Sequence, residues 1–93
     1  LLPAARALAR DLTVDSAPVS VALTRAMLWR MLGAPHPMDA HRIDSRAIWD
    51  RGRSADAREG VASFLEKRAA TFPDRVSADL PRWPGLLDDP EYR

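Results

Sequence analysis

The stretch APVSVALTRAMLWRML, residues 17–32, decides the fold class, because it carries the strongest helical pattern in the chain. Its apolar residues recur at helical spacing in two adjacent stripes: Val21, Leu28 and Leu32, and Leu23, Met27 and Met31. Together the stripes cover about half of the helix circumference, more than contact with a single neighbour needs. We therefore predict a helix over residues 18–32 that packs on two sides, with Pro18 at its first position and Gly33 just past its end.

Three further helices are expected outside this stretch. They span residues 3–12, 37–51 and 54–68. Ser54 is expected to cap the last of them, which closes with the cations of Lys67 and Arg68. Beyond residue 68, Pro73, Pro81, Pro84 and Pro90 interrupt any long helix. The sequence thus predicts an all-α fold of about four helices in residues 1–68, followed by a Pro-rich extended tail over residues 69–93.

The composition sets limits on the class of protein. The 93 residues are 46% hydrophobic and carry a net charge of +1, so the totals suggest no nucleic-acid or membrane partner. There is no cysteine, and no apolar run approaches a membrane span of roughly 18 residues. The chain begins Leu1-Leu2-Pro3, without an initiator Met or a signal peptide. We expect a piece of a longer, cytoplasmic protein.

No constellation of residues in the sequence predicts catalysis or metal binding. His36 and His41 are five residues apart, not at the i, i+4 spacing of two ligands on one helix face, so capping or packing is expected of them. The serines have no partnered histidine at a known motif spacing. Four aspartates are expected on a solvated charged face: Asp39, Asp44, Asp50 and Asp56. We accordingly predict no catalytic residue and no metal ligand in this chain.

Two kinds of binding module fit the same residues. The helices joined by GAPHP (33–37) could form a DNA-binding helix-turn-helix. However, the second of these helices mixes arginines and aspartates, whereas a DNA reader concentrates its cations on one helix. A protein–protein contact fits the broad apolar arc better, with Trp29, Trp49 and Trp83 as exposed anchors. These aromatics could instead fill a small core.

Two segments resemble one enzyme family. APVSVALTRAMLWRML (17–32) and SADAREGVASFLEKR (54–68) are similar to the C-terminal helical region of the enoyl-CoA hydratase/isomerase (crotonase) family. The second segment is the more specific, because it fixes six residues of a family signature together: Asp56, Glu59, Gly60, Phe64, Lys67 and Arg68. Ser63 stands where the family usually has Ala, and the chain from Val76 on matches no family pattern.

The resemblance implies that the chain is a C-terminal fragment of a larger α/β enzyme with a ββα-spiral core. Such an enzyme acts in fatty acid metabolism. It is a hydratase (a lyase) that adds water to a trans-2-enoyl-CoA, or a related isomerase. Its catalytic groups lie upstream, so this segment alone would lack them. Coenzyme A thioester enters as substrate, and no tightly bound cofactor is expected.

The resemblance also implies where ligand and partners would meet the chain. By position, Phe64 would lie near the adenine of CoA and Lys67, the chain's only lysine, near a phosphate. Expected partners are the enzyme's own N-terminal core and neighbouring subunits of a trimer or hexamer. Gly60 would allow a neighbouring helix to come close. Against these roles stand a core position for Phe64, a helix-end charge for Lys67, and a stand-alone helical interaction module without catalysis.

Overall fold

The structure is a computed structural model that describes residues 1–84 and 86. It contains five helices: α1 (Leu2–Thr13), α2 (Pro18–Met31), α3 (Pro37–Gly52), α4 (Ala55–Leu65) and α5 (Val76–Asp79). Within these residues there is no strand, so the predicted all-α class is confirmed. The first three helices lie where the sequence predicts them to within about one residue, and α4 is present but ends before its predicted last turn. The sequence does not predict α5, a single turn whose Asp79 carboxylate accepts a hydrogen bond from the Arg75 N–H at 2.8 Å.

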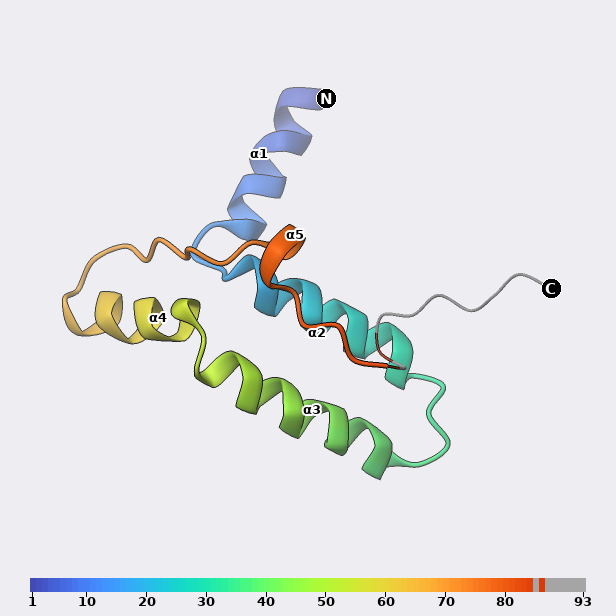
Figure 1. The fold of residues 1–93 in the computed structure, drawn as a ribbon. Helices are drawn as coiled ribbons and strands as arrows, with labels where there is room; N and C mark the ends of the chain where they lie inside the picture. Colours follow the sequence, from blue (N-terminus) through green and yellow to red (C-terminus); the bar gives the residue numbers. More distant parts are fainter. Residues whose placement is uncertain (85, 87–93) are drawn as a thin grey trace.

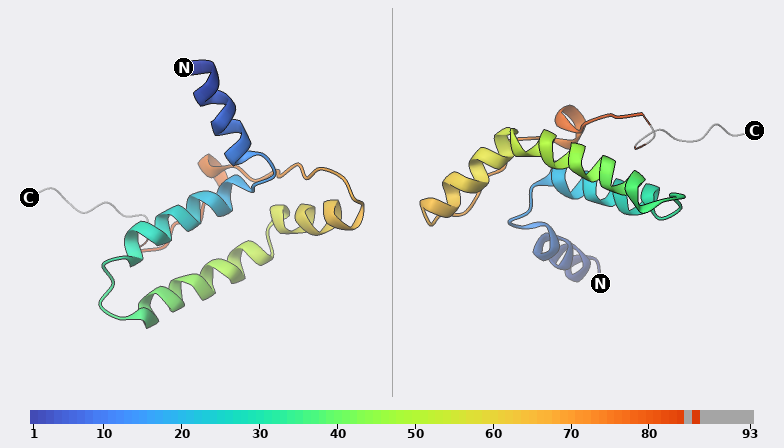
Figure 2. Two further views of the ribbon diagram at one scale, coloured as in Figure 1. Left: turned by 180° about the vertical axis from the view of Figure 1, so that it is seen from behind. Right: turned by 90° about the horizontal axis from the view of Figure 1, so that it is seen from below.

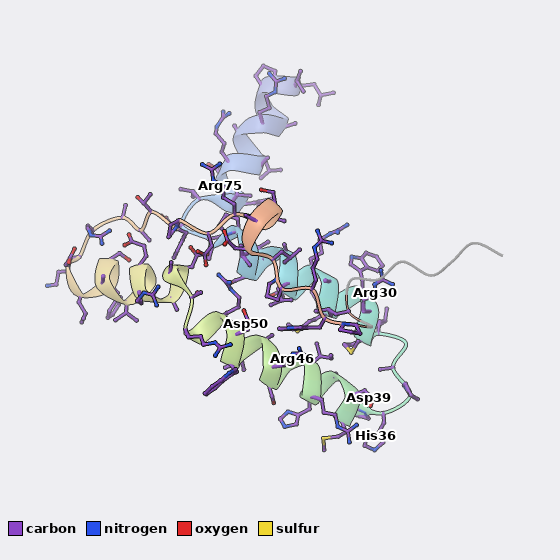
Figure 3. The ribbon with its side chains drawn as sticks, in the orientation of Figure 1. Arg30, His36, Asp39, Arg46, Asp50 and Arg75 are labelled. Atoms are coloured by element: carbon purple, nitrogen blue, oxygen red, sulfur yellow. The ribbon has the colours of Figure 1, made fainter. Side chains whose placement is uncertain are left out.

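Local sequence explains where the helices begin. Pro18 and Pro37 occupy the first turns of α2 and α3, where no intrahelical donor is needed. At α4, the Ser54 hydroxyl accepts a hydrogen bond from the Ala57 N–H at 3.1 Å. His36, labelled in Figure 3, stands before α3. Its Nδ1 accepts a hydrogen bond from the Met38 N–H at 3.0 Å and so caps α3, which confirms the capping expected of this histidine.

The helices form an open arrangement around α2 and α3. These two lie side by side, joined by the predicted 33–37 connection, and α4 continues from the end of α3 (Figure 1). The chain after α4 turns back, passes through α5 and runs along α2 (Figure 1). In each view α1 projects away from the rest at the N-terminus (Figure 2). The described part of the predicted tail, residues 69–84 and 86, is thus extended in part but returns to the body of the protein, and the rest of that tail lies outside the described residues.

The core lies between α2, α3 and this returning segment. Its buried members are Leu23, Ala47, Trp83 and Leu86, with Ala26, Met27, Ile43 and Leu80 packed against them. Trp83 is only 6% exposed, so the prediction that it is an exposed contact residue is wrong. The Arg46 guanidinium lies 4.9 Å from the centroid of the Trp83 ring and covers it as a cation–π contact.

A large part of the apolar surface stays open to solvent. Five hydrophobic side chains of the described residues are buried, whereas sixteen large ones are exposed. The radius of gyration is 15.7 Å, compared with about 12 Å for a compact domain of this length. The described part of the chain therefore has apolar faces that its own fold does not cover.

Candidate functional site

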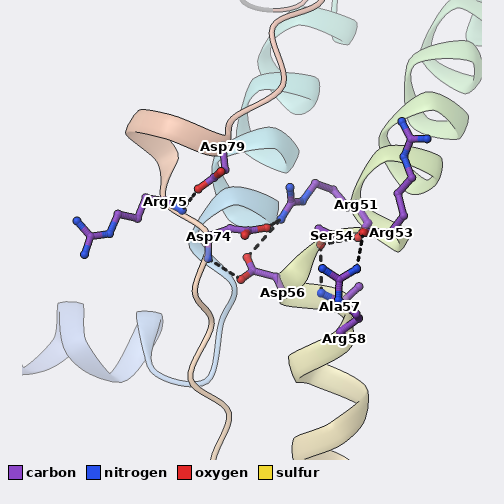
Figure 4. Close-up of polar contacts among 9 residues, drawn as sticks. All are labelled: Arg51, Arg53, Ser54, Asp56, Ala57, Arg58, Asp74, Arg75 and Asp79. Carbon is purple, nitrogen blue, oxygen red and sulfur yellow. Dashed lines mark hydrogen bonds and ion pairs between the residues drawn. The ribbon is translucent and has the colours of Figure 1, made fainter.

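The residues of the 54–68 signature fall into two groups, and the first group ties α4 to the returning segment. Asp56 is 3% exposed, in the first turn of α4. Its Oδ1 accepts from the Asp74 N–H at 2.9 Å, and its Oδ2 lies 3.3 Å from Arg51 Nη2 (Figure 4). The same Arg51 Nη2 lies 2.6 Å from Asp74 Oδ2. One largely covered cation, the side chain of Arg51 at 13% exposed, is thus shared by two carboxylates from opposite ends of a chain reversal.

This buried cluster corrects one sequence prediction. Asp56 does not lie on a solvated face, because the reversal at residues 66–73 brings Asp74 over it. The prediction agrees better with Asp44, which is exposed, and with Asp39, whose carboxylate is 3.9 Å from Arg42 on the surface of α3. Two arginines of α3 are also engaged within the chain: Arg46 with the Trp83 ring and Arg51 with Asp56 and Asp74.

A second tie forms around Glu59. Its two carboxylate oxygens accept hydrogen bonds from Arg68 Nη1 and Nη2 at 2.5 and 3.0 Å, and Oε1 also accepts from the Thr71 N–H at 2.9 Å. The bonds from Arg68 and then from Thr71 lower the pKa of Glu59 to about 2. Glu66 Oε2 accepts from Arg68 Nε at 2.6 Å, and the two carboxylates together raise the pKa of Arg68. Glu59 is therefore ionised at any ordinary pH.

The turn between these ties holds Lys67 in an unusual backbone conformation. Helix α4 ends at Leu65, so Lys67 and Arg68 lie beyond it and do not form its last turn as predicted. The Lys67 N–H donates to the Phe64 carbonyl at 3.3 Å and the Arg68 N–H to that of Ser63 at 3.0 Å. This pair of bonds is a Schellman motif, in which glycine usually occupies the left-handed position. Here Lys67 occupies it, with φ 53°.

The second group of signature residues points outward. Phe64 is 82% exposed, so it does not fill the core of the described chain. Lys67 is exposed as well, and its amino group makes no recorded hydrogen bond or ion pair with residues 1–84 or 86. Phe64 lies in the last turn of α4, and Lys67 lies in the turn that follows the helix. The structure brings the two predicted CoA contacts to one end of one helix.

Gly60 lies on the side of α4 that faces Phe72. A Cβ there would meet Phe72 Cε1 at 3.7 Å, an ordinary contact, so the expected close approach of a second helix is not found among the described residues. Next to it, the buried Ser63 hydroxyl donates to the Gly60 carbonyl at 3.1 Å. The serine that departs from the family's usual Ala is thus satisfied within its own helix.

The two stripes of α2 have different environments. Leu23 and Met27 belong to the core region, whereas Val21, Leu28 and Leu32 are 52%, 71% and 83% exposed. Shallow grooves run along the exposed stripe, where Leu28 lines two neighbouring ones. Helix α1 adds an uncovered face of its own, since none of its residues is buried. One side of α2 is covered by this chain and the other is open.

Other kinds of site are not seen in the described part of the chain. Across residues 1–84 and 86, no three His, Cys, Asp or Glu side chains are grouped so that they could hold a metal ion. In that same part, every helix is too short or too polar to cross a membrane.

Comparison with known proteins finds curated relatives that match most of this chain. Over 75 residues, 81% of the chain, it is 44% identical to the enoyl-CoA hydratases ACTT3 and AFT3-1 of Alternaria alternata. It is 40% identical over the same length to the enoyl-CoA hydratase AKT3-2 of that fungus. No model of a protein family matches the chain. The resemblance to enoyl-CoA hydratases inferred from the sequence is confirmed, and the chain spans about a quarter of the length of these curated relatives.

Proposed function

We propose that this chain is part of an enoyl-CoA hydratase that adds water to a trans-2-enoyl-CoA. In it the chain serves subunit assembly and closes the acyl-CoA site of a neighbouring subunit. The proposal is supported by relatives that carry this name and match four-fifths of the chain. The reacting groups are assigned to the remainder of the enzyme, and the chain itself supplies contacts to the nucleotide end of CoA.

The observation that carries the proposal is the division of the signature into tied and outward-facing residues. Asp56, Glu59 and Arg68 are used within the chain, whereas Phe64 and Lys67 are not. An exposed aromatic face suits stacking on a purine, and an ammonium suits a phosphate as a point charge. Lys67 also has φ 53°, and non-glycine residues in such conformations cluster at ligand sites as well as at helix ends.

Crotonyl-CoA hydration tests the proposal. The complete enzyme should hydrate crotonyl-CoA, while the isolated 93-residue chain, run in parallel, should not. Lys67→Ala should raise KM several-fold with little change in kcat, because one charge-assisted contact of about 1–2 kcal/mol is lost from bound substrate. Turnover by the isolated chain would show that its assignment as a non-catalytic segment is wrong.

A second candidate is a helical protein–protein interaction module without catalysis. The open stripe of α2 favours it, since Leu28 and Leu32 are largely exposed beside shallow grooves. On this hypothesis Lys67→Ala leaves KM for acyl-CoA unchanged. Both hypotheses predict that Leu28→Asp weakens assembly, so KM and not the oligomeric state distinguishes them.

A further inference from the structure

We propose that Glu59 is a positioning residue for Lys67: its contacts to Arg68 and Thr71 fix the turn that presents the Lys67 ammonium to the anionic end of the substrate. This inference rests on the proposed function, in which Lys67 meets a CoA phosphate. Nothing in the family signature alone assigns such a role to Glu59, because the signature does not show which residues the carboxylate touches.

Glu59 contacts two residues that follow Lys67 along the chain, Arg68 and Thr71. Glu59 lies on α4, where it holds the side chain of Arg68, the next residue after Lys67, through two oxygens. It also holds the Thr71 N–H, which limits the far end of the turn. Arg68 in turn reaches back to Glu66, the residue before Lys67. Lys67 is thereby bracketed on both sides while its own side chain takes no part in the network.

Such bracketing has a physical reason. A residue with a Cβ in the left-handed region is less stable there than in other conformations, and it persists when its surroundings determine it. If the ties to Glu59 are loosened, the turn gains other conformations and the ammonium occupies its binding position for a smaller fraction of the time. The apparent affinity for the anion falls by that fraction.

The same network also decides which cation is available. Two cations stand next to each other in the turn, but Arg68 is neutralised by Glu59 and by Glu66. Lys67 has no recorded carboxylate partner among the described residues. Because Glu59 pairs with Arg68, the Arg68 charge is used within the turn. The Lys67 ammonium is then the cation that can bind an external anion.

Steady-state kinetics of the complete enzyme with crotonyl-CoA test the inference. Glu59→Gln keeps an oxygen for the Thr71 N–H but loses the ion pair with Arg68, so we expect KM to rise about two- to threefold at unchanged kcat. Arg68→Lys, which keeps the charge but not the two-pronged geometry, should behave alike. The matched control is Asp39→Asn, which removes the same charge from an exposed pair on α3 and should leave KM unchanged.

The decisive measurement repeats Glu59→Gln in a Lys67→Ala background. If Glu59 acts through Lys67, its substitution has no further effect on KM once the ammonium is absent. An equal rise in both backgrounds, or no rise in the Lys67 enzyme, would overturn the inference while leaving the proposed function intact. If Lys67→Ala itself leaves KM unchanged, the CoA contact fails and the inference fails with it.

Discussion

Replacing Trp83 tests whether the returning segment is an integral part of the fold. The ring is 6% exposed and belongs to one buried cluster with Leu23, Ala47 and Leu86. A buried tryptophan removes about 150–250 Å² from water, which corresponds to about 4–6 kcal/mol as an upper limit. Because the unfolded chain already buries part of this area, we expect Trp83→Ala to lower the free energy of unfolding by about 3–5 kcal/mol.

Urea unfolding followed by far-UV circular dichroism measures this loss. A domain of this size has a free energy of unfolding of about 5–10 kcal/mol, so the urea concentration at the unfolding midpoint should fall by roughly half. Trp49→Ala is the matched control, since that ring is 70% exposed beside Arg53 and its removal should change stability by about 0.5 kcal/mol or less. If the two alanine variants unfold at the same urea concentration, the placement of Trp83 in the core is refuted.

Three further predictions concern α4 and its turn. Lys67→Gly should raise the free energy of unfolding by about 0.5–1 kcal/mol, since glycine adopts φ 53° without a clashing Cβ; a loss of stability in urea would contradict this. Asp56→Ala should lower it by about 2–3 kcal/mol, and Asp56→Asn by less because the amide oxygen still accepts from Asp74; equal urea midpoints for wild type and alanine variant would contradict it. Finally, Glu59 has a pKa of about 2 when folded and 4.5 otherwise, so its stabilising contribution is complete above pH 4.5 and is lost as the pH falls towards 2. The melting temperature should therefore fall less on acidification for Glu59→Gln than for the wild type. An equal fall in both proteins would count against the contacts of Glu59 with Arg68 and Thr71.

The positions of the main helices could be predicted because their signals are local. Proline at the first position, a capping serine or histidine, and the spacing of apolar residues all act within one or two turns. The same spacing predicts that α2 packs on two sides; among the described residues one stripe is packed and the other is exposed, so the second contact stays a prediction. Only the end of α4 differs, since its last predicted turn is replaced by the Schellman motif at Lys67.

The chain reversal after α4 could not be predicted in this way. Prolines show that a helix stops, but they do not show which direction the chain takes next. The direction is set by contacts between residues 12 to 23 positions apart: Thr71 with Glu59, Asp74 with Asp56, and Asp74 with Arg51. Without that reversal, Asp56 reads as a solvated carboxylate and Trp83 as an exposed ring. Both errors have one cause.

The structure divides the signature residues into two sets, those that hold the segment together and those that face solvent, which their sequence spacing alone does not show. Ser54 begins α4, Asp56 and Glu59 hold the returning chain against it, and Arg68 closes the turn. Each of these side chains has a hydrogen-bond partner within the chain. Phe64 and Lys67 follow the same helix and turn but face solvent, which is the arrangement expected when a scaffold exists to present two groups to something outside it. Lys67 is left-handed because it occupies the left-handed position of the Schellman motif that ends α4. Because the same turn fixes the direction of the Lys67 side chain, the proposed contact between its ammonium and CoA depends on this turn.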